Sequence, residues 1–126
     1  MSRDEAYVLD ILRAARLANE FLAGCEREAF ETDEKTQSAV LHQLLVLGEA
    51  VKRLSDEFRG RHPGVPWQQI AGMRNWIIHQ YADVDLDEVF LTVQRDLPEL
   101  VRNLENSGRI VLSNDTPEGP DEQGPG

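Results

Sequence analysis

Four polar side chains crowd into the stretch MRNWIIHQY, residues 73–81: Arg74, Asn75, His79 and Tyr81. A histidine can accept or donate a proton near neutral pH. An arginine can stabilise charge that develops on a phosphate. Together they could cleave RNA without a metal, with the histidine assisting attack by the 2′-hydroxyl or protonating the leaving 5′-oxygen. The product would be a cyclic phosphate.

The spacing of these residues limits which side chains can meet. On a helix of about 100° per residue, Asn75 and His79 share a face, whereas Arg74 and His79 are separated by about 140°. Arg74 and His79 converge only if the helix distorts or ends near His79, if the arginine side chain reaches around the helix, or if a second copy of the chain completes the site. Packing alone is an alternative: Asn75 could bond to His79, Arg74 could pair with an acid and Tyr81 could pack.

Metal chemistry finds little support in the sequence. His42, His62 and His79 lack a ligand spacing such as HExxH, and Cys25 is the single cysteine, so we expect no metal site, no cofactor and no disulfide. The amino terminus has no continuous apolar h-region, and no window approaches the roughly 18 apolar residues of a membrane span. We expect a cytoplasmic protein without a membrane segment.

The net charge argues against a nucleic-acid partner, whereas the distribution of charge along the chain allows one. The chain of 126 residues has a net charge of −10, whereas phosphate contacts need lysine and arginine. The distribution is uneven, because residues 52–81 carry five basic residues against two acidic ones. Lys52 and Arg53 in this segment are candidate RNA contacts, although charged helix ends are often only solvated.

Apolar spacing predicts two long helices in the first half of the chain. Apolar residues three and four positions apart form one stripe on a helix over residues 4–24. A second stripe follows Asp33, a suitable helix cap, and continues through Phe58 to the RGRHPG turn. Gly48 inside this helix costs about 1 kcal/mol relative to alanine, which indicates close packing against another helix.

The second half of the chain predicts two or three further helices. Pro66 suits the first turn of a helix that carries the motif, with residues 76–78 as its most buried part. Asp85 can cap the next helix together with Glu88 in a capping-box-like start. Pro98 either kinks this helix or divides it, in which case Asp96 caps the restart.

These elements predict an all-α fold, a bundle of four long helices or of five with a break at Pro98. We expect residues 1–106 to form one helical domain. Residues 107–126 are rich in glycine, proline and acid, and this composition predicts a disordered tail.

The motif and its surroundings resemble a known family. Residues 74–81, RNWIIHQY, fit the R-x4-H-x-Y pattern of the HepT toxins, a branch of the HEPN superfamily. The stretches LGEAVKRLSDEFRGRHPGVPW (47–67), IAGMRN (70–75) and DVDLDEVFLTVQRDLPEL (83–100) also resemble that family. The resemblance therefore covers about residues 4–105. Arg74, Asn75, His79 and Tyr81 show no departure from the family pattern, and Trp76 occupies a position that is expected to vary.

The resemblance implies a HEPN-like bundle that forms a symmetric homodimer. Arg74 and His79 would be the catalytic pair of a metal-independent ribonuclease in a cleft at the dimer interface, and Asn75 would orient His79. It also implies the toxin of a type VII toxin–antitoxin pair, whose nucleotidyltransferase antitoxin, MntA, transfers AMP from ATP to Tyr81. That AMP would place a phosphate charge and a nucleoside where RNA must bind. The alternative is a non-catalytic HEPN module that binds a nucleotidyltransferase partner or a nucleotide.

Overall fold

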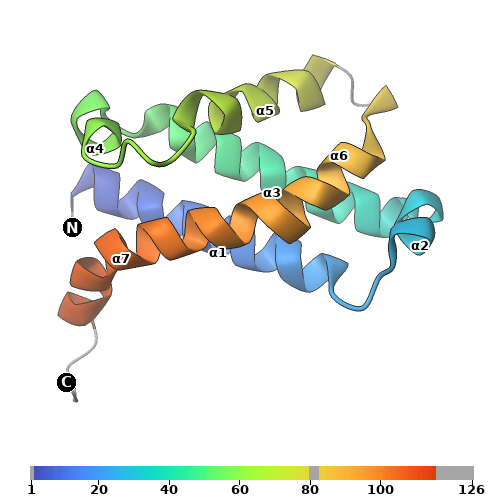
Figure 1. The fold of residues 1–126 in the computed structure, drawn as a ribbon, viewed down its shortest axis with the longest axis horizontal. Coiled ribbons are helices and arrows are strands. Elements are labelled where there is room, and N and C mark those ends of the chain that lie inside the picture. Colours follow the sequence, from blue (N-terminus) through green and yellow to red (C-terminus); the bar gives the residue numbers. More distant parts are fainter. Residues whose placement is uncertain (1, 80–82, 116–126) are drawn as a thin grey trace.

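The computed structural model describes residues 2–79 and 83–115, with side chains described as far as residue 106. Every long element in that part is helical (Figure 1). The elements are α1 (Arg3–Leu22), α2 (Arg27–Thr32), α3 (Glu34–Arg53), α4 (Asp56–Gly60), α5 (Trp67–His79), α6 (Leu86–Leu91), the π-helical turn η2 (Thr92–Asp96) and α7 (Leu97–Asp115). The predicted all-α bundle is confirmed.

Helices α1 and α3 run side by side in opposite directions and form the centre of the bundle (Figure 1). Helix α5 packs on α3, and the rod made of α6, η2 and α7 packs on α1. Helices α1, α3 and α5 and the rod all contribute fully buried side chains to one core, among them Ile11, Leu44, Ile77, Val93 and Leu104. Burial of these apolar side chains is the main contribution that stabilises the packing of the helices.

Helix α1 begins at a capping box. Ser2 Oγ accepts a hydrogen bond from the Glu5 backbone N–H at 3.1 Å, and the Glu5 carboxylate accepts one from the Ser2 backbone N–H at 2.9 Å. These bonds satisfy amide groups that a helix start otherwise leaves open. The predicted apolar stripe of α1 faces the core, with the buried residues Val8, Ile11, Ala15, Ala18 and Leu22.

The start predicted for the second helix is confirmed, but the predicted end lies beyond the observed one. The Asp33 side chain caps α3 as expected. The predicted continuation through Phe58 is wrong, because Leu54 adopts an extended backbone and Ser55 caps a separate helix, α4. The cause is a tertiary contact: Asp4 accepts hydrogen bonds from the Ser55 backbone N–H at 2.9 Å and from Ser55 Oγ at 2.7 Å. These bonds lower the pKa of Asp4.

The short helix α2 was not predicted from the sequence. Its Phe30 is fully buried and lies 6.0 Å from the Phe90 ring, measured between ring centroids. Arg27 in α2 forms an ion pair with Asp87 in α6. The turn between α1 and α3 is therefore held against α6 by one apolar and one charged contact.

The helix around Pro98 is continuous. Asp85 caps α6 as predicted, accepting a hydrogen bond from the Glu88 backbone N–H at 3.2 Å. Of the two alternatives for Pro98, a division of the helix with Asp96 as the new cap is wrong, because the Asp96 carboxylate bonds to Arg95 Nε at 2.8 Å and the backbone there is helical. The wider π turn just before Pro98 gives room to a ring that would otherwise clash with a preceding carbonyl.

The last helix, α7, extends to Asp115, past the predicted domain boundary at residue 106. Residues 116–126, the rest of the predicted tail, lie outside the described residues. The division into a domain and a tail therefore stays a prediction. Neither α7 nor any other helix in the described part is long and apolar enough to cross a membrane.

Helices α3 and α5 approach each other closely at Gly48. A Cβ atom at Gly48 would lie 2.9 Å from Arg74 Cβ, closer than real Cβ contacts. The close packing that the sequence predicted for Gly48 is therefore confirmed. It fixes the start of the Arg74 side chain directly against α3.

Replacing Gly48 with alanine tests this contact. Gly48→Ala is expected to lower the free energy of unfolding by about 1–2 kcal/mol, because the clash outweighs a gain of about 1 kcal/mol in helix propensity. Gly72→Ala in α5 is the matched control, since nothing lies within 4 Å of its added Cβ, and it should raise stability by up to about 1 kcal/mol. Urea denaturation measures the free energy of unfolding of both variants. Equal values for Gly48→Ala and Gly72→Ala would show that α3 and α5 can move apart at little cost in free energy.

Candidate functional site

Arg74 lies in an open groove of about 480 Å³. Three helices form it: α1, α3 and α5. The lining residues are Tyr7, Asp10, His42, Leu45, Val46, Glu49, Ala50, Arg53, Arg74 and Ile78. The groove therefore joins one residue of the motif to polar side chains that are distant in the sequence.

Glu49 is the central polar group of this groove. Its Oε1 atom lies 2.7 Å from Arg74 Nε, and its Oε2 atom lies 2.8 Å from an Arg53 terminal nitrogen. One carboxylate thus holds two guanidinium groups, and its hydrogen bond raises the pKa of Arg53. The ion pair with Arg74 is the contact that a packing role would predict, and it also fixes the direction of that side chain.

The far end of Arg74 stays accessible. Its side chain is 30% exposed, and Glu49 holds it through Nε. Among the described residues, its terminal nitrogens make one weak hydrogen bond, from Nη1 to Asn75 Oδ1 at 3.4 Å. A planar guanidinium anchored at Nε can still offer terminal N–H groups to a phosphate or carboxylate.

The groove of a single chain is electrostatically mixed. Two carboxylates, of Asp10 and Glu49, balance the guanidinium groups of Arg53 and Arg74. Lys52 is exposed at the end of α3 and does not line the groove. Within the described residues, no three His, Cys, Asp or Glu side chains are gathered as metal ligands.

His79 is the last residue of α5 and is exposed. Residues 80–82, which follow it directly, lie outside the described residues. His79 does not line the groove, and no hydrogen bond of the described residues joins it to Arg74 or Asn75. Within the described residues, the groove that contains Arg74 is therefore formed without His79. Tyr81 lies outside the described residues.

The groove contains a histidine that sequence reasoning considered only as a metal ligand. His42 lines it from α3, on the same face as Val46 and Glu49. A signal was present in the sequence, because positions 42, 46 and 49 follow helical spacing beside Gly48. The sequence alone did not show where α5 packs, and it is the packing of α5 that brings Arg74 to this face of α3.

Two apolar side chains at the groove are exposed. Ile78 is 48% exposed and Val46 is 37% exposed. The prediction that residues 76–78 form the buried part of the motif is correct for Ile77, which is fully buried, and wrong for Ile78. Trp76 is half-buried. Large exposed apolar side chains beside a polar groove are typical of a surface that another molecule covers.

Comparisons with known proteins place the chain in a family. The model of the family described as "Ribonuclease HepT-like" matches residues 11–107, so the chain belongs to this family. It is 40% identical over 94 residues to "Probable ribonuclease HepT" of Thermococcus cleftensis, covering 75% of this chain and 86% of that protein. It is 36% identical over 104 residues to "Putative RNase TTE0752" of Caldanaerobacter subterraneus, covering 82% and 93%. No solved structure matches the chain significantly.

Proposed function

We propose that the protein is an endoribonuclease that uses Arg74 and His79 and requires no metal. The observation that carries the proposal is the geometry of Arg74, held through Nε by Glu49 with its terminal nitrogens open to a groove, on the helix that also carries His79. Membership of the ribonuclease HepT-like family, and relatives named as ribonucleases, support RNA as the substrate.

The proposed reaction is an internal transesterification. The RNA 2′-oxygen attacks the adjacent phosphorus and loses its proton, the bond from phosphorus to the 5′-oxygen breaks, and that oxygen takes a proton. A 2′,3′-cyclic phosphate and a 5′-hydroxyl remain. His79 moves a proton and Arg74 stabilises the negative charge on the phosphate in the transition state. Asn75 supports the pair, and Lys52 and Arg53 contact the RNA backbone.

The active form in this proposal is a homodimer. Arg74 and His79 point in different directions on one helix, so a second copy would bring its own motif to the same cleft. The exposed side chains of Val46 and Ile78 beside the groove offer an apolar surface for that contact. Closing two grooves on each other would also exclude water from the charged groups, which strengthens their interaction with a phosphate.

Alanine variants test the catalytic pair. Wild-type protein in EDTA is expected to cleave total cellular RNA, and Arg74→Ala and His79→Ala should each lose at least about a hundredfold in rate. His42→Ala is the matched control, because His42 is also exposed and lines the same groove as Arg74. It should retain activity.

The same assay separates the rival interpretations. Loss of cleavage in His42→Ala but not in His79→Ala would transfer the proton-transfer role to His42. Absence of cleavage by folded, unmodified wild type would contradict the enzyme and favour the non-catalytic module that binds a nucleotidyltransferase or a nucleotide. In that case Arg74 would serve only its ion pair with Glu49.

A charge at Ile78 tests the dimer. Ile78→Glu is expected to convert a dimer into a monomer in sedimentation at micromolar concentration and to abolish RNA cleavage, because a carboxylate cannot be buried unpaired at an apolar contact. Leu91→Glu is the control, since Leu91 is similarly exposed, at 42% against 48% for Ile78, but lies in α6. A monomeric wild type that still cleaves RNA would contradict the shared cleft.

We further propose that the protein is the toxin of a toxin–antitoxin pair, silenced by a nucleotidyltransferase of the MntA kind. The Tyr81 phenolic oxygen would attack the α-phosphorus of ATP, releasing pyrophosphate and a proton, and the attached AMP would block RNA two residues from His79. Intact mass spectrometry after incubation with ATP and such an enzyme should show one added AMP and lost cleavage. Tyr81→Phe should gain no AMP, whereas Tyr7→Phe, which changes the only other tyrosine, should gain it. The reverse pattern would contradict this site.

A further inference from the structure

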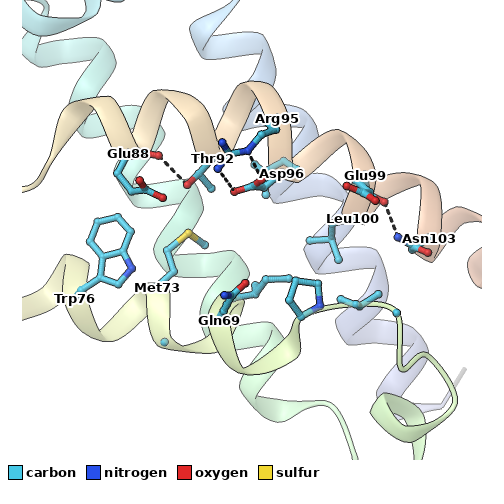
Figure 2. A pocket seen from close by; sticks show the side chains of 16 residues that line it. Gln69, Met73, Trp76, Glu88, Thr92, Arg95, Asp96, Glu99, Leu100 and Asn103 are labelled. Atoms are coloured by element: carbon cyan, nitrogen blue, oxygen red, sulfur yellow. Dashed lines mark hydrogen bonds and ion pairs between the residues drawn. The ribbon is translucent and has the colours of Figure 1, made fainter.

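A second hollow in the described structure lies on the other side of α5. It is a groove of about 800 Å³ between α5 and the rod formed by α6, η2 and α7. Figure 2 shows the side chains of α5 and of the rod facing each other across it. Met73 and Trp76 of α5 line this groove, whereas Arg74 between them lines the groove against α3. We call it the α5–α7 groove.

The floor of the α5–α7 groove is apolar. Met73, Leu97 and Leu100 form it, and all three are buried. Ile70 and Trp76 also line it and are only partly buried. An aromatic and an aliphatic side chain thus remain available to a further apolar partner.

The wall opposite α5 is acidic. Glu88, Asp96 and Glu99 line it against one basic residue, Arg95, which leaves a net charge of −2. Arg95 is already bonded to Asp96, at 2.8 Å. The carboxylates of Glu88 and Glu99 have no ion-pair partner among the residues whose side chains are described. Glu88 lies opposite Trp76 at one end of the groove (Figure 2), so a cation placed there would meet both a carboxylate and an indole.

The length and shape of the groove fit a helix. The lining residues of the rod lie at positions 88, 92, 95–97, 99–100 and 103. The helix from Glu88 to Asn103 spans about 22 Å at 1.5 Å per residue. A partner helix of about four turns would match this length. An amphipathic helix laid in such a groove places apolar side chains on the floor and charged ones along the rim.

We infer that the α5–α7 groove is the docking site for a basic amphipathic helix of a partner protein. Its apolar side chains would pack on Ile70, Met73 and Trp76, and its lysine or arginine side chains would pair with Glu88 and Glu99. RNA is disfavoured here because its phosphates would meet carboxylates. A second copy that presented the same groove is disfavoured because both acidic walls, each with a net charge of −2, would face each other. The inference does not depend on the nuclease proposal.

The location gives such a partner access to the motif helix. Met73 and Trp76 are the sequence neighbours of Arg74 and Asn75, on the face of α5 turned away from the groove against α3. A helix bound there would contact α5 without covering Arg74. The π-helical turn η2, which contributes Thr92, Arg95 and Asp96 to the wall, is a type of helix irregularity often found at functional sites.

A synthetic peptide probes the groove without knowledge of the natural partner. The probe has about 14 residues, with leucine on one face of the helix and lysine on the other, and a second peptide replaces every lysine by glutamate. Each is titrated into the full chain at an ionic strength of about 0.15 M, which screens diffuse attraction to the acidic protein. The lysine peptide is expected to bind and to move the Trp76 indole N–H signal in a nitrogen–proton NMR spectrum more than that of Trp67, which is buried. The glutamate peptide should not bind.

Paired variants locate the interaction. Glu88→Gln combined with Glu99→Gln should weaken binding of the lysine peptide about fivefold to tenfold, since two charge pairs are lost. The control is Glu28→Gln combined with Glu34→Gln. All four glutamates are exposed, so both double variants remove the same charge from the surface.

Three results would overturn the inference. Equal weakening by both double variants would show attraction to net charge alone. Failure of the lysine peptide to bind would exclude a basic helix as the occupant. Binding of spermidine at the groove in place of the peptide would assign it to a small organic cation instead.

Discussion

The contact between Gly48 and Arg74 is the constraint on which both grooves depend. Without a side chain at Gly48, α5 comes close enough to α3 that a Cβ atom there would lie 2.9 Å from Arg74 Cβ. The next residue along α3, Glu49, then reaches Arg74 Nε at 2.7 Å. Two consecutive residues thus supply the close approach and the charge that directs the arginine. Any larger separation of α3 and α5 would move Arg74 out of the groove and change the opposite face of α5 as well.

Helix α5 serves as a wall shared by two surfaces of different character. Because successive residues on a helix point about 100° apart, Arg74 faces α1 and α3 while Met73 and Trp76 face the rod of α6, η2 and α7. The surface at Arg74 balances its charges and exposes Ile78, whereas the other has a net negative rim. A phosphate-containing ligand and a basic partner would accordingly be sorted to opposite sides of one helix by charge alone.

The long helices of the fold could be predicted because each is marked by signals between residues that are close in the sequence. Apolar stripes of helical period identified α1 and α3, and Asp33 and Asp85 were recognisable as caps. The break after Arg53 could not be foreseen, since it depends on hydrogen bonds from Ser55 to Asp4, 51 positions away. The continuous helix at Pro98 depends on a π turn, which has no local signal comparable to a cap or an apolar stripe.

The sequence by itself determined which residues could act and how the motif is spaced: Arg74 and His79 on one helix, about 140° apart, in a pattern typical of the HepT family. Only the tertiary structure decided what surrounds them. It placed Glu49 and His42 beside Arg74 and left Ile78 exposed. The reason is physical: helix period and capping act between residues a few positions apart, whereas a groove is made by side chains of separate helices. Their relation is set by how closely the helices pack, and here Gly48 decides it.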